Sequence, residues 1–150
     1  MKYTINIDID LPKEKIIELF DNPDNMKYWQ KGFISIESIS GTPGQVGAKS
    51  KLKYKMGSRE IEMIETITKR DLPNEFSGTY EAKGVWNLNK NYFIELDVNR
   101  TKWKSEVEFK FTGFMKLIAF LVPGSFKKQS MKYLTDFKEF AENQKQKANQ

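Results

Sequence analysis

Apolar and polar residues alternate over most of the chain between Lys2 and Phe111, and a period of two is typical of β-strands that bury one face. The segments with this pattern are 2–10, 33–40, 48–56, 59–69, 76–82, 85–98 and 103–111. Turn-forming residues separate them, as at Gly57-Ser58. The pattern therefore predicts seven strands, if 85–98 forms a single long one.

Helical spacing replaces the alternation in two regions. After the first strand, Pro12 suits the first turn of a helix, and we expect short helices at 13–20 and 24–30. The longest helical pattern covers 112–147, and Pro123 predicts a kink or break within it. The apolar stripe of its second part consists of Phe126, Tyr133, Leu134, Phe137, Phe140 and Ala141.

A helix with so broad an apolar stripe needs a surface to lie on, and the predicted strands can provide it. Strands joined by short turns pair antiparallel, and strands with a single apolar face form a sheet that is covered on one side. We therefore predict an α+β fold in which an antiparallel sheet is covered by the C-terminal helix. The 150 residues suit a single domain, 1–150, whose polar end at 143–150 is expected to fray.

The composition limits the kinds of site and partner that the protein can have. The net charge of +5 comes from 25 Lys and Arg against 20 Asp and Glu, and Lys and Glu alternate along most segments, which indicates a solvated surface and not a nucleic-acid-binding stripe. The chain contains no cysteine or histidine, which excludes disulfides and Cys/His metal sites and removes the usual general base. The glycine-containing segment 41–47 has no phosphate-loop pattern and no helix after it. We expect no metal, no cofactor and no nucleic-acid partner, and, without a signal-peptide pattern or a membrane span, a cytoplasmic protein.

Three local segments resemble a known superfamily. The segment Asn25–Gln30 with Trp29 is similar to its second short helix, Gly44–Ala48 to the glycine-containing turn before its third strand, and 127–138 to the last helix of its small bacterial members. Together with the order of elements, these segments resemble the START-like or helix-grip superfamily (SRPBCC), which includes polyketide cyclase/dehydrase and lipid-transport proteins. The resemblance implies a curved seven-stranded sheet that grips the long helix, with a cavity for apolar molecules between them.

The first candidate site is that pocket between the sheet and the helix. The ligand-binding residues that we predict for it are Leu52, Tyr54, Met63, Glu65, Tyr80, Trp86, Tyr92, Trp103, Leu117 and Leu121. Apolar walls would favour an apolar guest. The alternative is that the large rings fill the space and form an ordinary core, as aromatic residues such as Trp29 and Trp103 usually do.

Glu65 is the second candidate, because it shares the apolar face of the strand 59–69 if the alternation continues without interruption. A buried carboxylate there would need partners, and Tyr54 and Tyr80 could supply hydroxyl groups from neighbouring strands. It could then serve as an acid or base, or as an anchor for a ligand's polar group. The favoured alternative is a bulge after Met63 that turns Glu65 outward and Ile64 inward, or a rim position in water, since one carboxylate in one strand is a weak signal.

The third candidate is the segment 114–122, which is apolar on nearly all sides. It could form a lid over the pocket or touch a membrane transiently, and Lys116, Lys127 and Lys128 would suit an anionic surface. The favoured alternative is a buried helical turn held by the end of the sheet.

These features favour a protein that binds or transports a hydrophobic or amphipathic, lipid-like small molecule and is not an enzyme. The alternatives are a cyclase or dehydratase that uses a cavity Glu or Tyr as its proton donor, and a co-chaperone-like protein-interaction module, which would need an exposed apolar patch. We predict no catalytic residue. No feature specifies a partner face, so we expect a monomer or a weak dimer.

Overall fold

The computed structural model describes residues 1–148, apart from the side chains of 145, 146 and 148, and within this range it confirms the predicted elements. The strands are β1 (Lys2–Ile9), β2 (Phe33–Ser40), β3 (Lys49–Met56), β4 (Arg59–Asp71), β5 (Glu75–Ala82), β6 (Val85–Asp97) and β7 (Arg100–Phe111). The helices are α1 (Lys13–Phe20), the 3-10 turn η1 (Pro23–Asn25), α2 (Met26–Trp29), α3 (Phe114–Leu121) and α4 (Gly124–Ala148).

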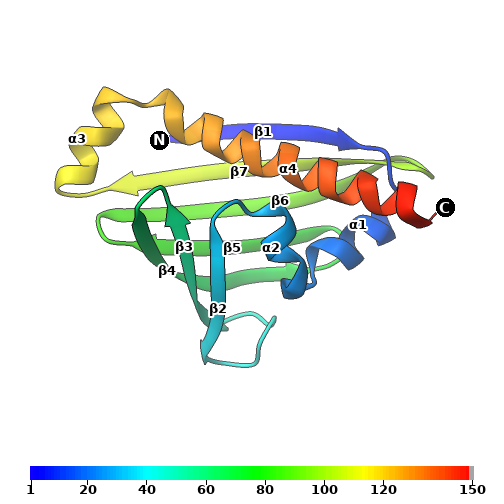
Figure 1. The fold of residues 1–150 in the computed structure, drawn as a ribbon, viewed down its shortest axis with the longest axis horizontal. Helices are drawn as coiled ribbons and strands as arrows, with labels where there is room; N and C mark the ends of the chain where they lie inside the picture. Colours follow the sequence, from blue (N-terminus) through cyan, green and yellow to red (C-terminus); the bar gives the residue numbers. More distant parts are fainter. Residues whose placement is uncertain (149–150) are drawn as a thin grey trace.

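The seven strands form one antiparallel sheet in the order β1-β7-β6-β5-β4-β3-β2. Only β1 lies out of sequence order, and it pairs with the last strand. Figure 1 shows that the sheet is strongly curved, with β2 and β3 turned steeply away from the direction of β5, β6 and β7. Register shifts in β2, β4 and β6 add to this bending, since a β-bulge increases the local twist. The curvature gives the sheet a concave face.

Helix α4 crosses the concave face, and its backbone lies close to those of β1 and α2. Near α1 the space between sheet and helix is filled by aromatic rings. Phe137 of α4 lies 5.1 Å from Trp29 and 5.3 Å from Trp103, measured between ring centroids, and Phe20 lies 5.1 Å from Phe93. This end of the fold is therefore an ordinary packed core.

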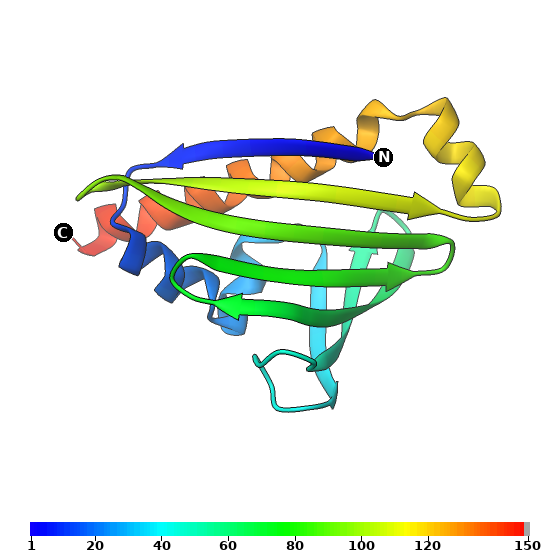
Figure 2. The same ribbon diagram turned by 180° about the vertical axis from the view of Figure 1, so that it is seen from behind.

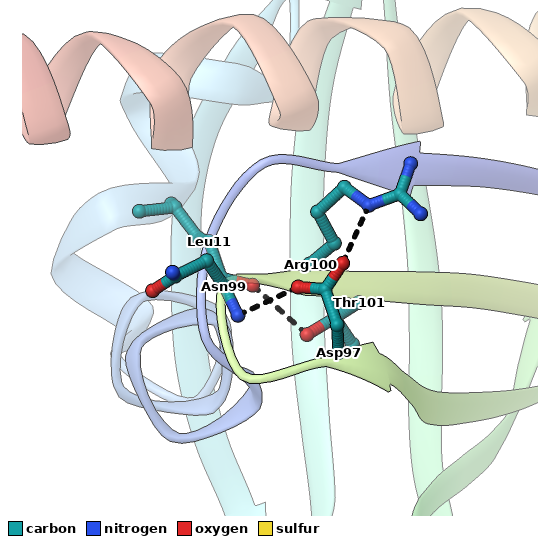
Figure 3. Close-up of polar contacts among 5 residues, drawn as sticks. All are labelled: Leu11, Asp97, Asn99, Arg100 and Thr101. Carbon is teal, nitrogen blue, oxygen red and sulfur yellow. Dashed lines mark hydrogen bonds and ion pairs between the residues drawn. The ribbon is translucent and has the colours of Figure 1, made fainter.

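The turn between β6 and β7 closes the same end (Figure 3). The fully buried Thr101 hydroxyl donates a hydrogen bond of 2.9 Å to the carbonyl oxygen of Leu11, which follows β1. On the outer side of the turn, the Asp97 carboxylate accepts bonds from the Asn99 N–H, at 2.9 Å, and from Arg100 Nε, at 3.0 Å. These bonds, the one from Asn99 first, hold the pKa of Asp97 below its usual value. The turn thus joins the start of α1 to the sheet.

The predicted break at Pro123 is confirmed, because α3 ends at Leu121 and α4 begins at Gly124. Helix α3 extends past the ends of the strands (Figures 1 and 2), so the prediction of a buried turn was wrong. The backbone of α4 is helical to Ala148, and residues 149–150 of the tail expected to fray lie outside the described part. Among residues 1–148, no helix has the length and apolar character that crossing a bilayer requires.

Candidate functional site

The pairing of β6 with β7 shows which side chains face α4. Trp103 of β7 contacts Phe137 of α4, and Phe93 of β6 lies directly opposite Trp103 in the register. Residues two apart on a strand share a face. The concave face of β6 therefore presents Val85, Asn87, Asn89, Asn91 and Phe93.

Polar side chains form a continuous row across the concave face. Partners directly opposite each other on neighbouring strands share a face, so the register places them in line. The polar row consists of Ser38, Ser50, Glu65, Tyr80 and Asn87, one residue from each of β2 to β6. The next partner of Asn87 is Phe109, whose ring lies 5.3 Å from that of Phe126 of α4. The polar row therefore ends beneath the helix.

An apolar row runs beside the polar row, two residues further along each strand towards α3. It consists of Ile36, Leu52 and Met63 on β2 to β4 and of Ala82, Val85 and Phe111 on β5 to β7. Leu52 is only 1% exposed, and the ring of Phe111 lies 4.8 Å from that of Phe126. The concave face is thus divided into a polar and an apolar strip.

Glu65 and Tyr80 form the centre of the polar row. They are direct cross-strand partners, and the Tyr80 hydroxyl lies close enough to the Glu65 carboxyl to influence its pKa. Burial raises the pKa of Glu65, while hydrogen bonding to the Tyr80 hydroxyl partly opposes that change. Burial, followed by the nearby Glu65 carboxylate, also raises the pKa of Tyr80 well above its ordinary value. This pair can therefore donate a proton or a hydrogen bond towards the concave side.

Tyr54 lies on the same face of β3, beyond Leu52. Its hydroxyl donates a hydrogen bond of 2.5 Å to Oε1 of Gln30, the residue that follows α2. Burial raises the pKa of Tyr54 well above its usual range, and Tyr133 of α4 and Glu65 contribute in the same direction. The hydroxyl of Tyr54 thus connects the sheet to the end of α2. Its hydrogen bond is already made within the protein, to Gln30.

Comparisons with known proteins agree on the fold. A conserved protein from Geobacillus kaustophilus superposes with a TM-score of 0.79 at 14% identity, over 95% of this chain and 96% of that chain. The Zhui aromatase/cyclase from Streptomyces sp. R1128 superposes with a TM-score of 0.73 at 11% identity, over 95% and 93% of the two chains. Ara h 8.0201 gives 0.77 at 16% identity, over 95% and 98%.

The chain has the helix-grip fold. The sequence matches no protein-family model and no curated protein. At such low identities the superpositions establish the architecture alone, because one fold can support many functions. The function must therefore be argued from this chain's own concave face.

Within the helix-grip fold, five of the predicted site residues lie together on the concave face. They are Leu52, Tyr54, Met63, Glu65 and Tyr80. The expected bulge after Met63 was wrong, because the register shift in β4 falls between Ile67 and Lys69, so Glu65 remains inward. Trp103 also faces inward, but it belongs to the aromatic core beside Phe137.

The orientation predicted for Trp86 and Tyr92 was wrong. Both lie on the convex face, where the ammonium groups of Lys110 and Lys104 lie 4.7 and 5.7 Å from the respective ring centroids. The lysine stems cover these rings, so an apolar side chain on this face is compatible with solvent. The alternate residues of β6, among them Asn87, Asn89 and Asn91, therefore face the interior of the fold.

The placement of Leu117 and Leu121 in the pocket was also wrong. Both side chains are exposed on α3, whose Met115 lies against Gly84 in the β5–β6 turn. The prediction required the apolar segment to fold back over the sheet. Gly113, with φ of +60°, and the break at Pro123 direct it outward instead.

Sequence reasoning missed the three inward asparagines of β6. Asn91 Oδ1 accepts a hydrogen bond of 3.0 Å from Trp103 Nε1, and Asn87 Nδ2 donates one of 3.0 Å to the Glu108 carbonyl oxygen. The available signal was the short β6–β7 turn, because counting back from Trp103 across that hairpin assigns Phe93 and the asparagines to its face. Asn89 lies two residues from both Asn87 and Asn91, so its side chain also faces the interior.

The two hollows best defined in the structure lie elsewhere. A groove of about 780 Å³ separates α2 from the end of α4, and a shallower hollow of about 420 Å³ lies near Lys13 and Tyr92. Neither hollow includes a residue of the polar or the apolar row. In the described part of the chain, no three carboxylates are close enough to hold a metal ion.

The raised pKa of Glu65 leads to a test of its burial. The folded protein holds this proton more tightly than the unfolded chain, so its contribution is fully favourable below the ordinary value of 4.5 and is lost as the pH rises through the raised pKa. We expect the free energy of unfolding of Glu65→Gln, which cannot ionise, to rise relative to that of the unchanged protein as the pH goes from acidic to neutral. Urea unfolding at both pH values measures this difference.

Glu62→Gln is the matched control, because Glu62 lies on the same strand, faces the other side and is exposed. Its variant should follow the unchanged protein at both pH values. If Glu65→Gln does the same, Glu65 is not buried in the way described.

Proposed function

We propose that the concave face binds an amphipathic small molecule, with its apolar part on the apolar row and its polar group at Glu65 and Tyr80. The observation that supports this most directly is the polar row itself. Its members on β3 to β6 are half-buried or buried, whereas Ser38 at the edge is exposed. Polar groups removed from water cost free energy unless they have partners, and an interior built only for stability would place apolar residues there. A row of polar residues beside a row of apolar residues matches a ligand that has both characters.

The electrostatics of the row favour a ligand whose polar group is uncharged. Burial raises the pKa of Glu65, which shows that this position disfavours negative charge. A carboxylate ligand would bring a second negative charge to the same position, whereas a hydroxyl or carbonyl group could share hydrogen bonds with the Glu65–Tyr80 pair. The apolar part of the ligand would contribute about 25 cal/mol for each Å² that it buries.

Proteins of the same architecture supply an analogy. Norcoclaurine synthase from Thalictrum flavum, whose structure superposes on this chain with a TM-score of 0.68 at 14% identity, was determined in complex with dopamine and hydroxybenzaldehyde. That complex shows that a protein of this architecture can hold small aromatic molecules. For this chain the analogy supports the class of ligand and does not name one.

Binding can be tested with the uncharged dye N-phenylnaphthylamine, displaced by decanol or by decanoate. We expect saturable dye binding and stronger displacement by the alcohol. Tyr80→Phe removes one hydroxyl from the polar row and should weaken the binding of decanol about tenfold, the usual effect of losing one hydrogen bond in a desolvated site.

Tyr92→Phe is the matched control, since it removes the same hydroxyl from the convex face. Its affinity for decanol should equal that of the unchanged protein. Equal affinities for Tyr80→Phe and Tyr92→Phe would remove the polar row from the site, and the absence of saturable binding would overturn the proposal.

A cyclase or dehydratase reaction is the second candidate, and the Glu65–Tyr80 pair is the feature that favours it. A carboxyl group whose pKa is raised keeps its proton closer to neutral pH and can transfer it to a bound substrate. Native mass spectrometry of the purified protein distinguishes the two functions. A co-purified molecule that is later released with a changed mass, in the unchanged protein but not in Glu65→Gln, would indicate catalysis.

A further inference from the structure

Large apolar side chains of α3 and of the residue after it are exposed to solvent. We define the α3 patch as Phe114, Leu117, Phe120, Leu121 and Val122, all of which are exposed. Phe120 is 81% exposed and Phe114 is 72% exposed. Figures 1 and 2 both show α3 beyond the ends of the strands, away from the layer formed by the sheet and α4. Stability does not explain this patch, because only Ala119 of α3 is buried.

The segment that contains the α3 patch carries charge of one sign. Residues 109–135 contain five lysines and no Asp or Glu, and the net charge of the whole protein is +5. The excess positive charge therefore lies in this one segment, and the rest of the chain is balanced. The fifth of these lysines, Lys132, pairs with Asp136, at 2.8 Å.

Four exposed lysines belong to α3 or to segments next to it and are called here the rim lysines. They are Lys83, Lys116, Lys127 and Lys128. Lys116 is within α3, and Lys127 and Lys128 follow it in the first turns of α4. Lys83 belongs to the β5–β6 turn, whose Gly84 lies against Met115 of α3. An apolar helix with a basic rim is therefore assembled from three elements.

We propose that the α3 patch docks this protein onto an anionic lipid bilayer. The apolar side chains would enter the boundary between headgroups and acyl chains, as amphipathic interfacial helices do. The rim lysines would lie against the negatively charged headgroups, where each basic side chain strengthens binding. Because α3 is only eight residues long, the contact is peripheral and reversible.

The same charges argue against a second copy of the chain as the occupant. A two-fold dimer places the same surface of both copies in contact, so the rim lysines of one copy would meet those of the other. Like charges that face each other across an interface oppose association. An anionic bilayer provides the opposite charge and an apolar layer at once.

Co-sedimentation with vesicles tests the docking. We expect binding to vesicles of phosphatidylcholine mixed with phosphatidylglycerol, weak binding to phosphatidylcholine alone, and a loss of binding at high salt. The double variant Phe120→Ser/Leu121→Ser and the triple variant Lys116→Gln/Lys127→Gln/Lys128→Gln should each bind the anionic vesicles about tenfold or more weakly. All five side chains are exposed, so both variants should remain folded, which circular dichroism verifies.

Controls come from exposed residues outside the α3 patch and the rim lysines. Val98→Ser changes a residue that is 75% exposed in the turn at the opposite end of the β6–β7 hairpin, and Lys31→Gln/Lys55→Gln removes exposed charge near β3. Both should bind anionic vesicles like the unchanged protein. The proposal is overturned if anionic vesicles are not bound or if the α3 variants bind them as well as the controls do. It is also overturned if analytical ultracentrifugation shows a dimer that Phe120→Ser/Leu121→Ser dissociates.

Discussion

Replacing Phe137 by alanine is expected to lower the free energy of unfolding by about 3–5 kcal/mol. Phe137 is fully buried, and its ring contacts Trp29, Trp103 and Phe20 at centroid distances of 5.1, 5.3 and 6.0 Å. These rings belong to α2, β7 and α1, so no single element can move to fill the cavity without disturbing the others. Against a typical total stability of about 5–15 kcal/mol, this loss would leave the protein marginal.

Urea unfolding followed by tryptophan fluorescence measures the change, because two of the tryptophans lie beside the substituted position. Phe120→Ala is the matched control: the chemical change is the same, but the ring is 81% exposed. We expect it to change stability by less than about 0.5 kcal/mol. If both variants lose the same stability, Phe137 is not the centre of the packing between helix and sheet.

Replacing Gly32 by alanine is expected to lower the free energy of unfolding by roughly 3–4 kcal/mol. Its φ angle of +82° lies in the left-handed region, and a Cβ atom there would fall 2.2 Å from the carbonyl oxygen of Lys55. The backbone must shift to relieve this contact, which strains the 2.7 Å hydrogen bond from the Lys55 N–H to the Gly32 carbonyl oxygen. The same movement would separate Gln30 from Tyr54 and open the side of the concave face next to α2.

Gly57→Ala separates the effect of the left-handed backbone from the effect of the close contact with Lys55. Gly57 has a φ of +66°, but a Cβ atom there would meet nothing within 4 Å, so only the backbone strain of about 1–2 kcal/mol applies. Thermal and urea unfolding of the two variants give the difference directly. Equal losses would show that the close approach of Gly32 to β3 contributes nothing, and that α2 is free to move relative to the sheet.

Local patterns in the sequence were enough to predict the helices and strands and part of the candidate site. The alternation in β4 is regular through Ile61, Met63 and Glu65, and the register keeps all three on the concave face. The helical stripe with Phe137 at its centre predicted the helix and its buried side, since both follow from spacing within one segment. The break at Pro123 likewise follows from the covalent geometry of proline.

What the sequence by itself determined is the order and type of the elements and the antiparallel sheet with its covering helix, because periodicity and turn residues act over a few positions. Only the tertiary structure decided which face of β6 is inside and where α3 points. Both faces of β6 have large side chains or hydrogen-bonding groups, so its own pattern was misleading. Pairing with β7 turned Trp86 outward and Asn87 inward, because the packing of a whole sheet on a helix outweighs the preference of one strand.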